Sequence, residues 1–135
     1  MKKVKLVEKL KERELTELKR KLQQLLKELS ETRRAISERE SRLEGLFKAG
    51  TSPAVELWLT AQFGHETLKE IEALRAKEAK LESEIEALKE QMGLLNAQVK
   101  LLKSFRKKRE LQETKKEEIL LERLVYQALS GSGGG

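Results

Sequence analysis

The chain has 135 residues, of which 39% are charged and only 4% are aromatic. This composition excludes a wide globular core and favours a long coiled coil, which buries only a narrow apolar stripe of each helix. The 29 Lys and Arg residues exceed the 23 Asp and Glu residues by six, and their interleaved signs are typical of a solvated helix surface. Without cysteine, the sequence offers no disulfide and no thiolate metal ligand.

We expect no direct membrane insertion, because no apolar run approaches the ~20 residues that a transmembrane helix needs. Residues 1–8 include the acidic Glu8 and no long apolar region, which does not fit a secretory signal peptide.

A first helix is predicted from about Lys2 to Phe47. Its apolar positions recur every three and four residues, a spacing that keeps one seam apolar and makes helices supercoil. Apolar residues before Leu15 are out of phase with this seam, so we expect a stutter or fraying in the first turns. The seam comprises Leu15, Leu18, Leu22, Leu25, Leu29, Thr32, Ile36, Arg39, Leu43 and Leu46.

A break is predicted at residues 48–53, where Gly50 suits a helix C-cap and Pro53 suits a first helical turn. A second helix is predicted from about Pro53 to Leu129. The Gly/Ser tail of residues 130–135 has the composition of an added linker, and we set it apart from the functional argument. The second seam comprises Ile71, Leu74, Glu78, Leu81, Ile85, Leu88, Met92, Leu95, Val99 and Leu102.

The short break predicts an all-α fold in which the two helices form an antiparallel coiled-coil hairpin, a single domain over residues 1–129. A turn centred near Gly50 sets the register. It predicts that Leu22 faces Leu81, that Leu29 faces Leu74, that Leu25 meets Glu78, that Thr32 meets Ile71 and that Arg39 lies opposite Gly64.

On this register the second helix overhangs the first after about Leu102. The overhang begins with the basic run Arg106, Lys107, Lys108 and Arg109, next to Phe105. Because glutamates follow closely and no further aromatic residue accompanies the run, we expect contact with an acidic protein surface or a solvated face and no nucleic-acid partner. A later apolar cluster that includes Leu121, Leu124 and Val125 would be exposed, as interaction sites are.

Near the break, apolar side chains outnumber those that two helices can bury. Trp58 and Phe63 are of the type that anchors interfaces, and Phe47 lies close by. A hydrophobic plug at the hairpin tip would use the same burial of aromatic rings, so both interpretations stay open.

No catalytic constellation is present, and no metal site or cofactor is expected. The single histidine, His65, lacks the partners that a triad or a zinc site requires, and two helices form no concave pocket. We therefore expect no enzyme activity.

The chain resembles the FliJ family of coiled-coil proteins of the flagellar and related type III export apparatus. The resemblance rests on the basic start at residues 1–10, the glycine-containing break near residue 50, the Trp58–Phe63–Leu68–Ile71 stretch, and the aromatic–basic segment of residues 104–111. It spans nearly the whole chain apart from the Gly/Ser tail.

The resemblance implies a cytoplasmic stalk, peripheral at the export apparatus, that enters the hexameric export ATPase ring with the end carrying both termini. The region near the turn would contact the cytoplasmic part of the export-gate membrane protein, and export chaperones are possible further partners. Carried onto this chain, the family implies two contact sets. The ATPase-ring set is Phe105, Arg106, Lys107, Lys108, Arg109, Leu121, Leu124 and Val125; the export-gate set is Leu43, Phe47, Trp58, Phe63 and Leu68.

Two alternatives remain at this stage. A structural or designed antiparallel coiled coil would suit the regular heptads, although Gly64 and Gly93 are residues that a designer avoids inside helices. A holdase-type chaperone of the prefoldin kind also uses helical hairpins, but it would bring a β-hairpin, and no strand-like alternation appears.

Overall fold

The computed structural model describes residues 2–48 and 54–132, and these form two helices without a strand. Helix α1 spans Lys2–Lys48 and helix α2 spans Ala54–Ser132. The described α1 thus ends one residue after the predicted Phe47, and α2 continues three residues past the predicted Leu129. Of the predicted break at residues 48–53, Lys48 belongs to α1, and residues 49–53, with Gly50 and Pro53, lie outside the described residues. Within the described helices, none is long and apolar enough to cross a membrane.

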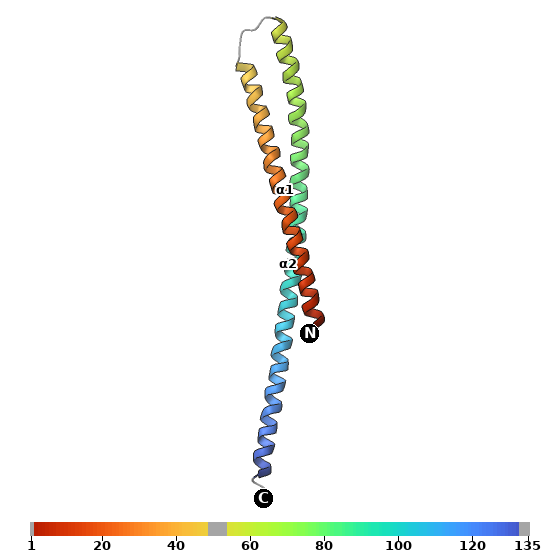
Figure 1. The fold of residues 1–135 in the computed structure, drawn as a ribbon, viewed down its shortest axis with the longest axis vertical. Helices are drawn as coiled ribbons and strands as arrows, with labels where there is room; N and C mark the ends of the chain where they lie inside the picture. The colour runs from red at the N-terminus through yellow and green to blue at the C-terminus, as the bar shows by residue number, and fades with distance from the viewer. Residues whose placement is uncertain (1, 49–53, 133–135) are drawn as a thin grey trace. The chain divides into compact units, whose positions relative to one another are not determined.

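The chain divides into two compact units. Unit 1 comprises residues 1–15 and 93–135, and unit 2 comprises residues 16–92. In each unit α1 runs antiparallel to α2: in unit 2 Arg33 pairs with Glu82 and the later Glu40 pairs with the earlier Arg75. The all-helical hairpin is thereby confirmed (Figure 1).

The core of unit 2 is the predicted heptad seam. One cluster joins Leu29 of α1 to Leu81 and Ile85 of α2, with Leu22 and Leu25 packed against it. A second cluster holds Ile36, Leu43, Ile71 and Leu74. Between them Thr32 is buried, and its hydroxyl donates a 2.8 Å hydrogen bond to the Glu28 carbonyl of its own helix, so this polar seam residue needs no partner on α2.

The register predicted from a turn centred near Gly50 is wrong by about one heptad. Leu29 packs on Leu81 and Ile85 instead of Leu74. Arg39 Nε donates to Glu70 Oε2 at 2.8 Å, and the atom nearest to a Cβ built on Gly64 is Leu43 Cδ2, at 3.8 Å.

Polar matching explains the slip. The predicted register would have set the carboxylate of Glu78 against Leu25, whereas the observed one brings it level with Thr32 and 3.3 Å from Arg33 Nε. The hairpin is also asymmetric at its tip, because α2 begins beyond the last turn of α1 (Figure 1).

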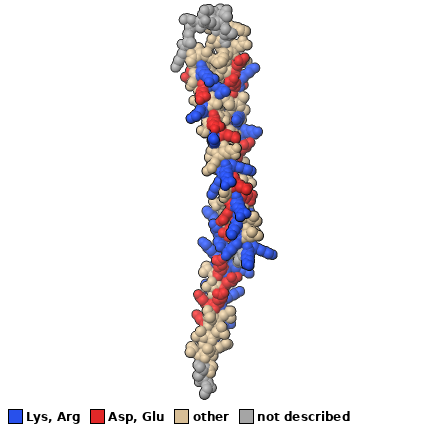
Figure 2. Space-filling model, viewed as in Figure 1, with Lys and Arg blue, Asp and Glu red and all other residues tan. Residues whose placement is uncertain are grey.

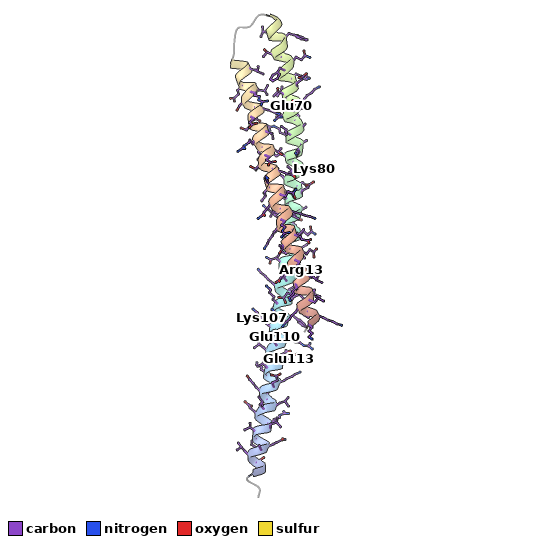
Figure 3. The ribbon with its side chains drawn as sticks, viewed as in Figure 1. Arg13, Glu70, Lys80, Lys107, Glu110 and Glu113 are labelled. Carbon is purple, nitrogen blue, oxygen red and sulfur yellow. The ribbon has the colours of Figure 1, made fainter. Side chains whose placement is uncertain are left out.

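Ion pairs line the seam of unit 2. Arg33 bonds Glu82 at 2.8 Å, and this hydrogen bond is the main reason that the pKa of Arg33 lies above its ordinary value. Arg75 reaches Glu40 at 2.6 Å, and Arg39 reaches Glu70, which Figure 3 labels on α2. Each pair is solvated and contributes little free energy, but together they penalise other registers.

Candidate interaction surfaces

In unit 1 the heptad of α1 continues without the expected stutter. The seam runs back from Leu15 through Lys11 and Glu8 to Val4, again with spacings of four and three, and α1 is unbroken from Lys2. Opposite it, the seam of α2 continues through buried Leu95 and Val99 and half-buried Leu102 and Arg106. The prediction followed the apolar residues, but the seam itself turns polar here.

Polar side chains therefore form the last layers of this seam. The carboxylate of Glu8 is buried, and Arg106 Nε lies 3.3 Å from its Oε2. The Arg106 Nη2 donates a longer 3.4 Å bond to Oε1, while Nε and Oε2 lack hydrogen-bond geometry within the described chain. Lys11 Nζ donates to Gln98 Oε1 at 2.7 Å, and Lys103 pairs with Glu12 at 3.1 Å.

Apolar side chains that the seam excludes lie on the outside of unit 1. Val7 and Leu10 each immediately precede a seam residue of α1. On α2, Leu94, Leu101 and Phe105 each precede a seam residue in the same way. In an antiparallel pair such positions flank the seam on the same side of both helices, so these five exposed side chains share one side of the hairpin.

On α2, the residues that lie one position before each seam residue form a second stripe with the same heptad spacing. We call it the outer stripe. Two of its large side chains are widely exposed: Leu101 is 70% exposed and the aromatic Tyr126 is 73% exposed. The stripe is apolar at both ends and polar in its middle. It comprises Leu94, Gln98, Leu101, Phe105, Lys108, Gln112, Lys115, Ile119, Glu122 and Tyr126.

Beyond Arg106, every described side chain of α2 is exposed through Gly131, and we call residues 107–131 the C-terminal extension. The overhang was predicted from about Leu102 and in fact begins near Lys107, because the one-heptad slip lengthens the paired part. A groove lined by Lys2, Lys3, Val4, Phe105, Arg109 and Glu113 marks the place where α1 begins.

Charge changes along the extension. Lys107, Lys108 and Arg109 precede glutamates at 110, 113, 117 and 118, after which the helix is largely uncharged. Figure 2 shows this order along α2 toward its C-terminal end, and Figure 3 labels Lys107, Glu110 and Glu113 near the start of α1. The apolar residues near the end include Ile119, Leu120, Leu121, Leu124, Val125 and Tyr126.

The predicted ATPase-ring residues do not share one environment. Lys107, Lys108 and Arg109 are exposed, as are Leu121, Leu124 and Val125. Phe105 is half exposed on the outer stripe. Arg106 differs from the rest, since its side chain is 25% exposed and holds Glu8.

The predicted export-gate residues also divide. Trp58, Phe63 and Leu68 are exposed on the first turns of α2, and Leu57 is exposed with them, so this apolar surface is not fully enclosed as a plug. Leu43 is buried in the seam beneath Gly64. The side chain of Phe47 lies outside the described residues.

Sequence reasoning missed Glu8 as a seam residue, as well as Leu94 and Leu101 as an exposed pair. The available signal was the phase of the repeat: extending the spacing of Leu15 and Leu18 backwards reaches Glu8, and Leu94 and Leu101 fall one residue before the seam. His65 is exposed. Within residues 2–48 and 54–132, no group of three His, Cys, Asp or Glu side chains could hold a metal ion.

No family model, no curated protein and no solved structure matches this chain. The fold and its surfaces define an all-helical hairpin with exposed apolar side chains near the tip and along the extension.

Proposed function

We propose that the chain is a non-enzymatic stalk of a type III export apparatus, in which the C-terminal extension enters the hexameric export ATPase ring. One observation carries this proposal: α2 continues as a single exposed helix past the start of α1, with a basic segment followed by an apolar end. A single helix is narrow enough, at roughly 10–12 Å across with side chains, to occupy the central opening of a ring.

The extension supplies two kinds of contact. Lys107, Lys108 and Arg109 offer exposed cations for an acidic collar, and Leu121, Leu124 and Val125 offer an apolar tip to be buried farther in. Arg106 serves differently in this proposal. By holding Glu8, it keeps α1 against α2 at the point where the extension begins.

The opposite end of α2 supplies the second contact. The exposed Trp58, Phe63 and Leu68 would bind the cytoplasmic part of the export-gate membrane protein, and Leu43 would support them from the seam. The protein would then be cytoplasmic and peripheral at the export apparatus, with export chaperones as further partners. The resemblance to the FliJ family motivates these assignments, and the exposure of the three side chains is compatible with them.

The test is ATP turnover and hexamer assembly of a purified flagellar export ATPase with the full chain or with a truncation ending at Glu113. The truncation keeps the Glu8–Arg106 pair and removes the apolar tip. Trp58→Ala is the matched control at the other end. Stimulation by the full chain and by Trp58→Ala, but not by the truncation, supports the stalk.

Failure of all three proteins to bind the ATPase would contradict the stalk. The alternatives then separate readily. A holdase suppresses the aggregation of an unfolded client, whereas a purely structural coiled coil binds neither the client nor the ring.

A further inference from the structure

We propose that the outer stripe of α2 is a self-association surface, on which a second copy of this chain binds antiparallel about a two-fold axis near Glu110 and Leu111. The inference concerns unit 1 alone and does not depend on the stalk proposal. The inference is based on the sequence of the stripe: when a second copy runs in the opposite direction, apolar positions at one end face apolar positions at the other.

The spacing of the apolar residues fits this axis. An antiparallel pair with its axis near residue 110 brings Leu101 of one copy level with Ile119 of the other, and Leu94 level with Tyr126. All four side chains are about half exposed or more. Because the two-fold axis repeats each contact, both of these apolar pairs occur twice, while Phe105 lies level with Lys115.

A groove lies at the C-terminal end of the stripe. It is lined by Ile119, Glu122, Arg123, Tyr126 and Gln127, and so includes the exposed side chains of Ile119 and Tyr126. Their spacing of seven residues equals that of Leu94 and Leu101. Residues seven apart on a helix repeat the same face, so two stripes of this kind can interdigitate along their length.

Charge selects the antiparallel direction. Between Val99 and Glu110 the ionisable side chains are all basic, whereas the helix beyond Glu110 carries Glu113, Glu117, Glu118 and Glu122 together with Lys115, Lys116 and Arg123. Antiparallel pairing sets Lys100 near the glutamates at 118 and 122 of the second copy. Parallel pairing would set Lys108 and Lys115 against themselves, and like charges directly opposed are destabilising.

The α1 side chains Val7 and Leu10 extend the surface. They flank the seam on the same side as Leu101 and Phe105, so a second copy lying along the outer stripe also covers them. A two-fold interface of this kind is closed, and it yields dimers without further growth.

The same helix provides a matched control. Leu124 is exposed to nearly the same degree as Leu101, but it lies on the other side of α2, about half a turn from the outer stripe. Leu124→Glu therefore introduces the same charge at a similar exposed leucine without entering the proposed interface.

The test is sedimentation equilibrium of the purified full chain, with helix content checked by circular dichroism. We expect a concentration-dependent dimer. Leu101→Glu and Ile119→Lys should each weaken it at least tenfold, while Leu124→Glu leaves it unchanged.

Mixing the two weakened variants gives the sharpest readout. In a mixed dimer, Glu at 101 meets Lys at 119 on one side of the axis, and Leu101 meets Ile119 on the other. The mixture should therefore dimerise more strongly than either variant alone.

A wild-type chain that remains monomeric at ~100 μM, a concentration that detects even weak association, would overturn the proposal. So would a dimer that Leu101→Glu leaves intact, a mixture that shows no rescue, or growth into trimers and larger species. None of these outcomes involves the export ATPase, so this test and that of the stalk fail independently.

Discussion

Arg106 Nε lies 3.3 Å from Oε2 of Glu8, and the two residues occupy seam positions that carry apolar side chains elsewhere in the hairpin. The Glu8 residue is only 6% exposed. A buried carboxylate is costly unless a cation compensates it, so this pair fixes which part of α2 the start of α1 can bind.

Removing one member of this pair should destabilise the protein, and removing both should not. Glu8→Ala leaves the guanidinium without its partner and should cost about 1–3 kcal/mol. The double variant Glu8→Leu with Arg106→Leu restores an apolar layer and should be neutral or more stable by ~1–4 kcal/mol. Urea unfolding measures both values. A double variant less stable than Glu8→Ala would contradict the account.

Two neighbouring leucines test the seam of unit 2. Leu29 is 6% exposed and packs on Leu81 and Ile85, whereas Leu26 is 44% exposed. Leu29→Ala should cost ~2–5 kcal/mol because it leaves a cavity. Leu26→Ala should change stability by no more than ~0.5 kcal/mol, as surface substitutions do. Thermal unfolding followed by circular dichroism distinguishes the two variants. Equal losses of stability would contradict the assignment of Leu29, and not Leu26, to the seam.

Gly64 and Gly93, in the interior of α2, should each accept alanine with a gain in stability. A Cβ at Gly93 meets nothing within 4 Å, and a Cβ at Gly64 meets only Leu43 Cδ2 at an ordinary contact distance. Each substitution removes helix-breaking backbone freedom and should add up to ~1 kcal/mol. Gly64→Leu is the contrast, since its larger side chain must displace Leu43. Loss of stability in Gly64→Ala would show that the helices approach more closely there.

Thr32→Val should raise stability by several tenths of a kcal/mol up to ~1 kcal/mol. The threonine is buried, and its hydroxyl bonds only the Glu28 carbonyl, an interaction that slightly destabilises helices. Valine keeps the shape and removes the polar group. Thr32→Ser keeps the hydroxyl and loses the methyl, so it should be less stable than the wild type. Denaturant unfolding of both variants checks the order, and a destabilised Thr32→Val would mean that the hydroxyl serves α2.

The heptad repeat predicted the helices and the seam, but it left the register undetermined. A shift of seven residues sets seam positions against seam positions again, so the leucines alone cannot distinguish Leu74 from Leu81 as the neighbour of Leu29. The position of Glu78 decides, because it avoids Leu25 and reaches Arg33 only after the shift. A turn centred on Gly50 was a poor guide because α2 begins beyond the end of α1.

The exposure of apolar side chains was predictable where they depart from the seam, as at Trp58 and Leu121. Arg106 was the exception. Its place in a run of four basic residues suggested an exposed cation, and only the phase of the repeat, carried back to Glu8, assigns it to the seam.

The continuity of α2 has a consequence for how the extension keeps its structure. Starting a helix is far less favourable than lengthening one, and an isolated segment of about 25 residues with this many charges would be only marginally helical in water. Residues 107–131 do not have to nucleate a helix of their own. They continue the turns before Arg106, which are paired with α1 and supply the backbone carbonyls for the next hydrogen bonds. The helical structure of the extension thus depends on the paired part of α2. Loosening Glu8 from Arg106 would therefore reduce the helix content of residues that do not contact α1.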